Sequence, residues 1–324
     1  MRRIMVMLTV AVGGIFLLLR KSYQLAKKRA LERLRSGSKI IETEYGTVEY
    51  CIVGRGKPLL VLHGIIGNYE QGRISTNMLE DQPYQRIMIS RPGYLRTPSN
   101  GASTAAYQAD LCAAMLDELG IETVIVMGIS GGGPAALEFA KRYNNRCEGL
   151  ILMGAVSKAL DMYKIQASRV ITLLSTARFT DFWAWLLIEG VVLLQPFFAL
   201  FNKDVDTRLL KDREGQRLFA QLLRSSFPIS PLQPGIDNDI LQFRSLPVTN
   251  LQDIRVPTLI LQGTDDVTVP VTQAEYLAQE IPDARLIKVQ DAEHAFFITH
   301  RDEISSEIID FIDANTAREP SRDQ

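Results

Sequence analysis

Short runs of consecutive apolar residues recur along the chain, and segments with helical spacing of apolar residues separate them. Runs of this kind are typical of strands that are buried on both faces of a parallel sheet. They occupy residues 58–62, 86–90, 123–127, 150–153, 258–261 and 285–289. Ahead of them, apolar and polar residues alternate in 39–45 and 47–53, which meet at Gly46 and predict a half-buried hairpin.

Helices are predicted between these runs. The segment 103–120 has apolar residues at helical spacing, with Ser103 or Thr104 as its N-cap and Gly120 at its end. Further helices are expected at 135–143, 271–280 and about 302–314. Strands that alternate with helices predict an α/β fold, in which a mostly parallel central sheet carries helices on both faces.

The alternation stops between residues 157 and 245. This stretch contains no clear buried strand and has a helical pattern, so we expect an inserted helical cap between the fourth and fifth buried strands. Four segments follow: 1–38, an anchor and basic linker; 39–156, the first part of the core; 157–245, the cap; and 246–324, the rest of the core with a polar tail.

The first residues differ in kind from the rest. An uncharged run at 4–19 lies between Arg2-Arg3 and Arg20-Lys21. As a helix it would measure about 24 Å, short of a hydrocarbon core of roughly 30 Å, and flanking basic side chains can bridge that gap. The interpretation is an uncleaved membrane anchor; a cleaved signal peptide and a helix lying in the membrane surface are the alternatives. Basic residues are more numerous after the run, which predicts that the body of the protein faces the cytoplasm.

Composition narrows the function classes. Apolar residues make up 46% of the 324 residues, charged residues 23%, and the net charge is −1, as in a folded protein with no field that favours nucleic acid. Cys51, Cys112 and Cys147 each lie in an apolar stretch, which predicts buried free thiols and a reducing compartment. The cysteines and the three histidines have no metal-ligand spacing, and we expect neither metal nor cofactor.

A glycine-rich turn supplies the candidate nucleophile. Residues 128–132 read Gly-Ile-Ser-Gly-Gly, a G-x-S-x-G pattern with Ser130 at its centre, between a buried strand and an alanine-rich helix. That strand–turn–helix context is the one the motif requires, and glycines allow the sharp turn. A capping serine in a plain turn and a phosphate loop are the alternatives. A Walker loop needs Lys-Ser or Lys-Thr after its last glycine, and here Pro134 follows; the dinucleotide-binding pattern G-x-G-x-x-G is also absent.

In the order of its motifs the chain resembles the α/β-hydrolase superfamily over residues 39–156 and 246–314. The motifs are His63-Gly64, Arg91-Pro92-Gly93-Tyr94, Gly128 to Pro134, Gly263-Thr-Asp-Asp266 with Pro270, and Asp291-Ala-Glu-His294. The resemblance implies a triad in the order Ser130, Asp266, His294. It implies backbone oxyanion donors at Ile65 and Gly131.

The histidine and the aspartate of this triad each have competing candidates in the sequence. His63 lies in the His-Gly turn, where the family uses backbone, and His300 precedes the last helix, which leaves His294 as the base. Asp265 is one residue short of the family spacing from glycine to acid to proline, so Asp266 is the expected acid.

The expected reaction is cleavage of an ester or thioester through an acyl-serine. The same triad acting on another bond or acceptor, as in C–C hydrolases, amidases and acyltransferases, is the first alternative, and a non-catalytic binding protein is the second. The run 182–201 is apolar enough to roof the site, which favours a hydrophobic, lipid-like acyl substrate. Glu189 and Pro196 inside the run predict a broken helix.

Overall fold

The central sheet has eight strands in the order β1-β2-β4-β3-β5-β6-β7-β8. A computed structural model describes residues 2–99, 101, 103–160, 181–201, 208, 212–246 and 250–316. The strands are β1 Lys39–Thr43, β2 Gly46–Val53, β3 Lys57–Leu62, β4 Tyr84–Ile89, β5 Val124–Ile129, β6 Cys147–Met153, β7 Thr258–Gly263 and β8 Ala284–Val289. β1 and β2 form the predicted antiparallel hairpin, β2 pairs antiparallel with β4, and all other neighbours are parallel.

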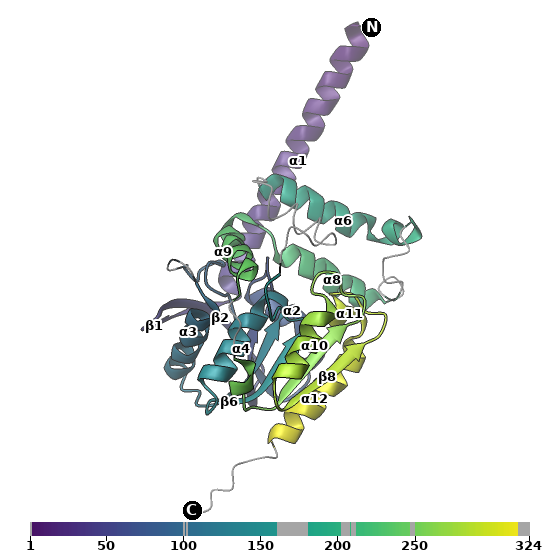
Figure 1. The fold of residues 1–324 in the computed structure, drawn as a ribbon. Coiled ribbons are helices and arrows are strands. Elements are labelled where there is room, and N and C mark those ends of the chain that lie inside the picture. Colours follow the sequence, from purple (N-terminus) through teal and green to yellow (C-terminus); the bar gives the residue numbers. More distant parts are fainter. Residues whose placement is uncertain are drawn as a thin grey trace, which may run out of the picture.

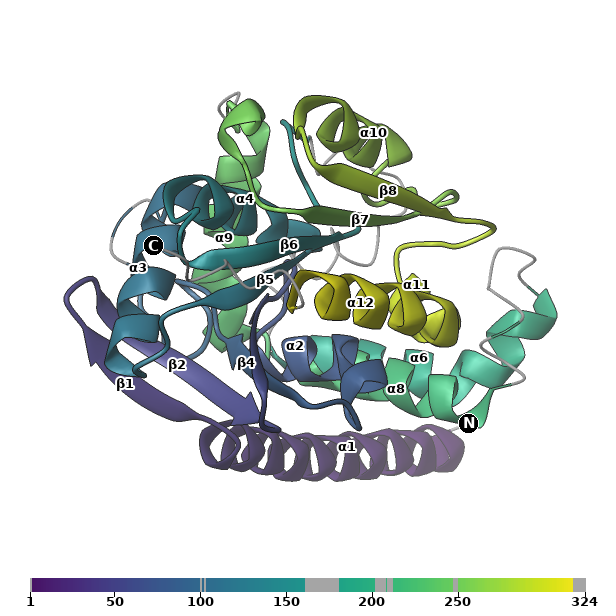
Figure 2. The ribbon, with the colours of Figure 1, turned by 90° about the horizontal axis from the view of Figure 1, so that it is seen from below.

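Helices cover both faces of this sheet, which confirms the predicted α/β class (Figure 2). One face packs against α3 (Ala105–Glu118), α4 (Gly133–Arg142) and α10 (Val271–Glu280). The other packs against α2 (Tyr69–Ser75), α12 (Arg301–Thr316) and the end of α1 (Arg2–Ser36). The central strands are buried on both faces, because the layer of helices on each face covers the side chains that point to that face.

The segment between β6 and β7 forms a helical cap over one end of the sheet (Figure 1). Its described helices are α6 (Asp181–Phe201), α8 (Arg213–Ser225) and α9 (Gln233–Arg244). The predicted break in the apolar run is wrong, since α6 is one continuous helix through residues 189 and 196. Glu189 need not interrupt it, because Arg224 of α8 binds its carboxylate at 2.6 and 2.9 Å.

A buried ion pair fastens the cap to the core. The guanidinium of Arg91, which follows β4, donates to both carboxylate oxygens of Asp239 in α9, at 2.9 and 2.5 Å. Tyr94 donates its hydroxyl hydrogen to the same carboxylate at 2.6 Å. Both charged side chains are only 2% exposed, so the pair is shielded from water and its geometry fixes where α9 sits.

Helix α1 leaves the body at its N-terminal half and packs on it at its C-terminal half (Figure 1). Ala30 and Leu34 are buried, and Tyr23 packs edge-on against Phe182 of the cap. Lys27 donates to Asp181 at 2.5 Å, and their mutual attraction raises the pKa of Lys27. The C-terminal half of α1 therefore packs on the body through one face of the helix.

The structure does not support the predicted membrane anchor. In the part of the chain that it describes, no helix is long and apolar enough to span a membrane. The uncharged run measures about 24 Å against roughly 30 Å of hydrocarbon, and the helix continues from it directly into Arg20 and Lys21.

The three cysteines are free thiols, as predicted. Cys112 and Cys147 are buried and Cys51 is half-buried. Burial raises the pKa of Cys112 and of Cys147 to about 12, which keeps both thiols protonated and unreactive.

Candidate active site

Ser130 stands on a strained turn between β5 and α4. Its φ is +49°, in the left-handed region that a residue with a side chain rarely adopts. The neighbouring glycines make that turn possible. A Cβ at Gly128 would lie 2.7 Å from the Cβ of Ala136, and one at Gly132 would lie 2.2 Å from the carbonyl oxygen of Leu62. The predicted G-x-S-x-G motif is thus a sharp elbow that holds Ser130 at the end of the strand and the start of a helix.

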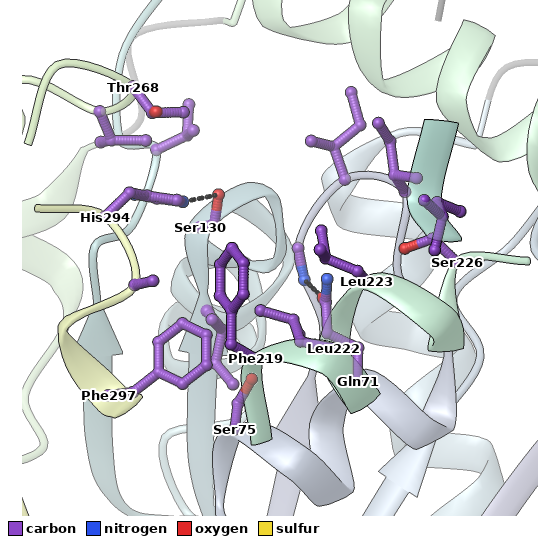
Figure 3. Close-up of a pocket in the computed structure, with 18 of the residues that line it drawn as sticks. Gln71, Ser75, Ser130, Phe219, Leu222, Leu223, Ser226, Thr268, His294 and Phe297 are labelled. Atoms are coloured by element: carbon purple, nitrogen blue, oxygen red, sulfur yellow. Dashed lines mark hydrogen bonds between the residues drawn. The ribbon is translucent and has the colours of Figure 1, made fainter. Parts of the chain in front are cut away.

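The structure brings Ser130, His294 and Asp266 together in one chain of contacts. His294 Nε2 lies 3.0 Å from Ser130 Oγ, and His294 Nδ1 lies 2.7 Å from Asp266 Oδ2 (Figure 3 shows the first contact). Each residue comes from a loop at the carboxyl end of a strand, respectively β5, β8 and β7. This edge is where ligands bind in open parallel sheets.

Asp266 is held in place by further donors. Its Oδ1 accepts the backbone N–H groups of Thr268 and Val269 at 2.9 and 2.8 Å, and its Oδ2 accepts from Gln262 at 3.0 Å. These hydrogen bonds fix the orientation of the carboxylate. Asp265 is exposed and makes no contact of this kind with His294, in agreement with the choice of Asp266 from the spacing.

The charge of Asp266 also sets the acidity of His294. Burial alone would lower the pKa of His294, but the negative charge of Asp266 and its hydrogen bond outweigh burial and raise that pKa above its ordinary value. The imidazole is therefore a stronger base than a free histidine, with Nδ1–H directed at the carboxylate and Nε2 left to face the serine.

The two predicted oxyanion donors lie in segments that face each other beside Ser130. A Cβ built on Gly131 would lie 3.1 Å from the backbone nitrogen of Ile65, and one built on Gly64 would lie 3.0 Å from the Cβ of Ser130. Gly131 follows the serine in the 3₁₀ turn Ser130–Gly132, where N–H groups have no intrahelical partner. The backbone of Ile65 and that of Gly131 therefore lie close to each other beside Ser130.

His63 has a structural role and is not part of the contact chain. Its Nε2 accepts the backbone N–H of Arg91 at 2.9 Å, and its Nδ1 lies 2.7 Å from the carbonyl oxygen of Gly64. Burial, and then the charge of Arg91, hold the pKa of His63 well below its ordinary value, so the ring stays neutral. It fixes the loop that carries Ile65. His300 contacts Thr299 and does not reach Ser130.

Gln71 is a site residue that the sequence pattern did not reveal. It lies in α2, and its side-chain oxygen accepts the backbone N–H of Gly64 at 2.7 Å. This hydrogen bond ties the loop that carries Gly64 and Ile65 to helix α2. The one signal for this helix is Asn68, which caps it by accepting from the N–H of Glu70 at 2.8 Å.

The contact chain opens into a cavity of about 370 Å³ whose walls are mostly apolar (Figure 3). This volume lies in the range of small-molecule sites. The cap supplies Leu187, Ile188, Val191, Phe219, Leu222 and Leu223. The tryptophans of the apolar run are not part of the wall: Trp183 is 52% exposed, and Trp185 packs near Tyr23.

The described residues contain no cluster of three or more His, Cys, Asp or Glu side chains that could hold a metal ion. The polar groups that converge on the cavity are instead the hydroxyl and imidazole of the contact chain with a few neutral side chains. The hydroxyl of Ser130 can act as a nucleophile, and the imidazole of His294 can act as an acid or a base.

A parallel sheet with a serine on a strand–helix elbow, facing a histidine and a buried carboxylate at its carboxyl edge, defines an α/β hydrolase. The family model described as alpha/beta hydrolase fold matches residues 57–301, and the chain belongs to this family.

Individual relatives agree with that membership. An uncharacterized hydrolase of Bacillus subtilis (strain 168), YcgS, is 30% identical over 265 residues, which are 78% of this chain and 90% of that protein. The 2-hydroxymuconate semialdehyde hydrolase of Pseudomonas putida is 26% identical over 80% of this chain and 88% of its own length. Among solved structures, an alpha/beta hydrolase fold protein from Nakamurella multipartita superposes with a TM-score of 0.69 at 27% identity, over 85% of this chain and 98% of that one.

Proposed function

We propose that the protein is a serine hydrolase that cleaves esters or thioesters of a hydrophobic, lipid-like acyl group. The observation that carries the proposal is the 3.0 Å contact between His294 Nε2 and Ser130 Oγ at the mouth of an apolar cavity. A base within hydrogen-bond reach of a hydroxyl, and itself oriented by a carboxylate, is the arrangement that activates a serine nucleophile.

The geometry suits an acyl-serine mechanism. Ser130 Oγ attacks the carbonyl carbon while His294 Nε2 accepts its proton, and the oxyanion that forms is held by the N–H groups of Ile65 and Gly131. His294 then gives the proton to the departing alcohol or thiol, which leaves an acyl group on Ser130. A water molecule, deprotonated by His294, attacks this acyl carbon. The acid is released and Ser130 regains its proton.

Asp266 supports both half-reactions. It keeps the Nδ1–H tautomer of His294 and stabilises the imidazolium that forms when Ser130 or water gives up its proton. The strained φ of Ser130 is part of the elbow that holds the hydroxyl beside His294, so the nucleophile is positioned before the substrate binds.

A second candidate keeps the triad and changes the bond or the acceptor, as in a C–C hydrolase, an amidase or an acyltransferase. The similarity to 2-hydroxymuconate semialdehyde hydrolase favours this alternative over a binding protein without activity. Both hydrolytic candidates require a reactive Ser130, and the binding protein does not.

The test uses the full chain and a chain-length series of p-nitrophenyl esters with matched thioesters. We expect turnover that rises with acyl length, together with covalent labelling by a fluorophosphonate probe. Ser130→Ala is the control and should lose both. Labelling of Ser130 without turnover of any ester or thioester would favour the second candidate. Failure of the probe to label the wild-type protein would reject both hydrolase candidates.

A further inference from the structure

Ser75 places a buried hydroxyl in the wall of the active-site cavity. It is the last residue of α2, its side chain is fully buried, and it lines the same cavity as Ser130. Its Oγ has no hydrogen-bond partner among the residues that the structure describes. Figure 3 shows its oxygen directed into the pocket below Phe219.

The neighbouring residue shows that the helix offers an internal partner for such a group. The hydroxyl of Thr76 donates to the carbonyl oxygen of Gly72, four residues earlier, at 2.8 Å. A serine can bond the helix backbone in the same way. Ser75 does not, and its hydroxyl faces the cavity instead. A buried polar group without a partner destabilises a protein, and the contents of the cavity that Ser75 lines can supply the partner.

Among the described residues, the rest of this part of the wall does not supply that partner. Phe219, Leu222 and Phe297 surround the Ser75 side chain in Figure 3, and all three line the cavity. The amide oxygen of Gln71 already accepts from Gly64. A purely apolar ligand arm would fill the space and leave the Ser75 hydroxyl unpaired, whereas an arm with one oxygen would satisfy it.

We propose that Ser75 determines specificity, and that the substrate carries within an otherwise apolar arm one oxygen function, a ketone or a hydroxyl, that hydrogen-bonds the Ser75 hydroxyl. This inference rests on the proposed hydrolase function, because it concerns the substrate of the same site. A site built around a hydrogen bond discriminates strongly against an analogue that lacks the group, because the buried partner then stays unpaired.

The test compares ligands that differ only in this oxygen. One series consists of octanoate esters with a ketone moved along the acyl chain, and a second consists of acetate esters with a ketone moved along an octyl leaving group. Each is compared with the plain ester by its Kd for the full-length Ser130→Ala protein, measured by calorimetry. This readout needs no turnover, so a failure of the proposed hydrolase function is seen separately in the assay of the wild-type enzyme.

We expect one ketone position, in one of the two series, to bind at least about tenfold more tightly than the plain ester. Adding Ser75→Ala should reduce this ratio to about one. Adding Ser226→Ala instead removes a cavity hydroxyl that is only partly buried and should leave the ratio as it was. The melting temperature of the Ser75→Ala protein should not fall, because the hydroxyl has no partner in the described fold to lose.

The proposal is overturned if no ketone position in either series is preferred, or if the preference survives Ser75→Ala. It is also overturned if Ser226→Ala removes the preference to the same extent. A fall in melting temperature of several degrees with an unchanged ratio would assign Ser75 a structural role instead.

Discussion

His294 Nε2 lies 3.0 Å from Ser130 Oγ, although 164 residues separate the two in the chain. The sheet produces this contact, because both residues follow strands whose carboxyl ends lie along one edge. Neither side chain has to be recruited from a mobile lid. The elbow fixes the serine and Asp266 fixes the ring, so the pair is oriented before substrate binds.

Replacement of Ser130 tests this pair directly. Ser130→Ala should lower kcat for the best ester by roughly 10⁶-fold. The residues of a triad act as a unit, so removal of the nucleophile alone costs about as much as removal of the whole triad. The fold should be unaffected, since His294 is the one hydrogen-bond partner of the Ser130 hydroxyl in the part of the chain that the structure describes. Steady-state turnover and thermal unfolding check the two parts. Retention of more than a few per cent of the activity would place the nucleophile elsewhere.

The choice between two adjacent aspartates is testable by the matched pair Asp266→Asn and Asp265→Asn. Asp266→Asn should lower kcat by roughly 10⁴-fold, because the amide no longer stabilises the imidazolium and permits the wrong tautomer. Asp265→Asn changes an exposed side chain and should have little effect. The opposite ranking would show that Asp265 is the acid.

The pH profile gives an independent check on the same contact. His294 accepts a proton only when neutral, so kcat/KM should fall as the pH drops through its pKa. Because Asp266 raises that pKa, the acid limb of the wild-type profile should lie above the ordinary histidine value of about 6.5. In Asp266→Asn the raising charge is gone, and the limb should move to lower pH. An acid limb at the same pH in both proteins would contradict this.

Several parts of this site follow from local sequence. Continuous apolar runs mark the central strands, and the Gly-x-Ser-x-Gly spacing between a strand and a helix marks the elbow. The spacing predicts Asp266 as the acid, because Asp266, and not Asp265, has a proline four residues later. Signals of this kind extend over a few residues, and a single sequence displays them directly.

Other parts could not be read in this way. Helix α2 has only seven residues, and its buried residues Tyr69, Gly72 and Ser75 do not form an apolar stripe. The sequence pattern therefore does not predict that Gln71 and Ser75 of this helix line the cavity. The pair of Arg91 and Asp239 joins positions 148 residues apart, and neither neighbourhood signals the other. The continuity of α6 depends likewise on Arg224, a partner in another helix.

The apolar wall should control chain-length preference. Phe219→Ser puts a hydroxyl in place of an aromatic ring in the cavity lining, and the ratio of kcat/KM for octanoate over acetate esters should fall by about tenfold. Trp183→Ser is the matched control from the cap, because this exposed side chain does not line the cavity, and the ratio should stay as in the wild type. A preference for short esters in all three proteins would refute a lipid-like substrate without affecting the triad.

The ion pair between cap and core should be a major contributor to stability. Asp239→Ala leaves the guanidinium of Arg91 buried without its carboxylate, which typically costs about 3–5 kcal/mol in the free energy of unfolding. Glu214→Ala removes an exposed partner of Arg217 and should cost less than about 1 kcal/mol. Urea unfolding of both variants gives the comparison. Equal effects would mean that the buried pair does not anchor the cap.

Truncation distinguishes the two halves of α1. Removal of residues 1–19 should change the melting temperature little, because Ile15 to Leu18 are more than half exposed and the segment contacts the cap through Phe16, whose ring centroid lies 6.5 Å from that of Phe182. Removal of residues 1–38 also deletes the buried Leu34 and the partner of Asp181, and it takes away the carbonyl oxygen that accepts the Tyr69 hydroxyl at 3.0 Å. Burial of one leucine is worth about 1.5–3 kcal/mol, so the melting temperature should drop by at least about 2–5 °C. Differential scanning calorimetry of the two truncated proteins measures this. If both melted at the temperature of the full chain, the packed half of α1 would contribute nothing to the fold, and the contacts with Tyr69 and Asp181 would be energetically neutral.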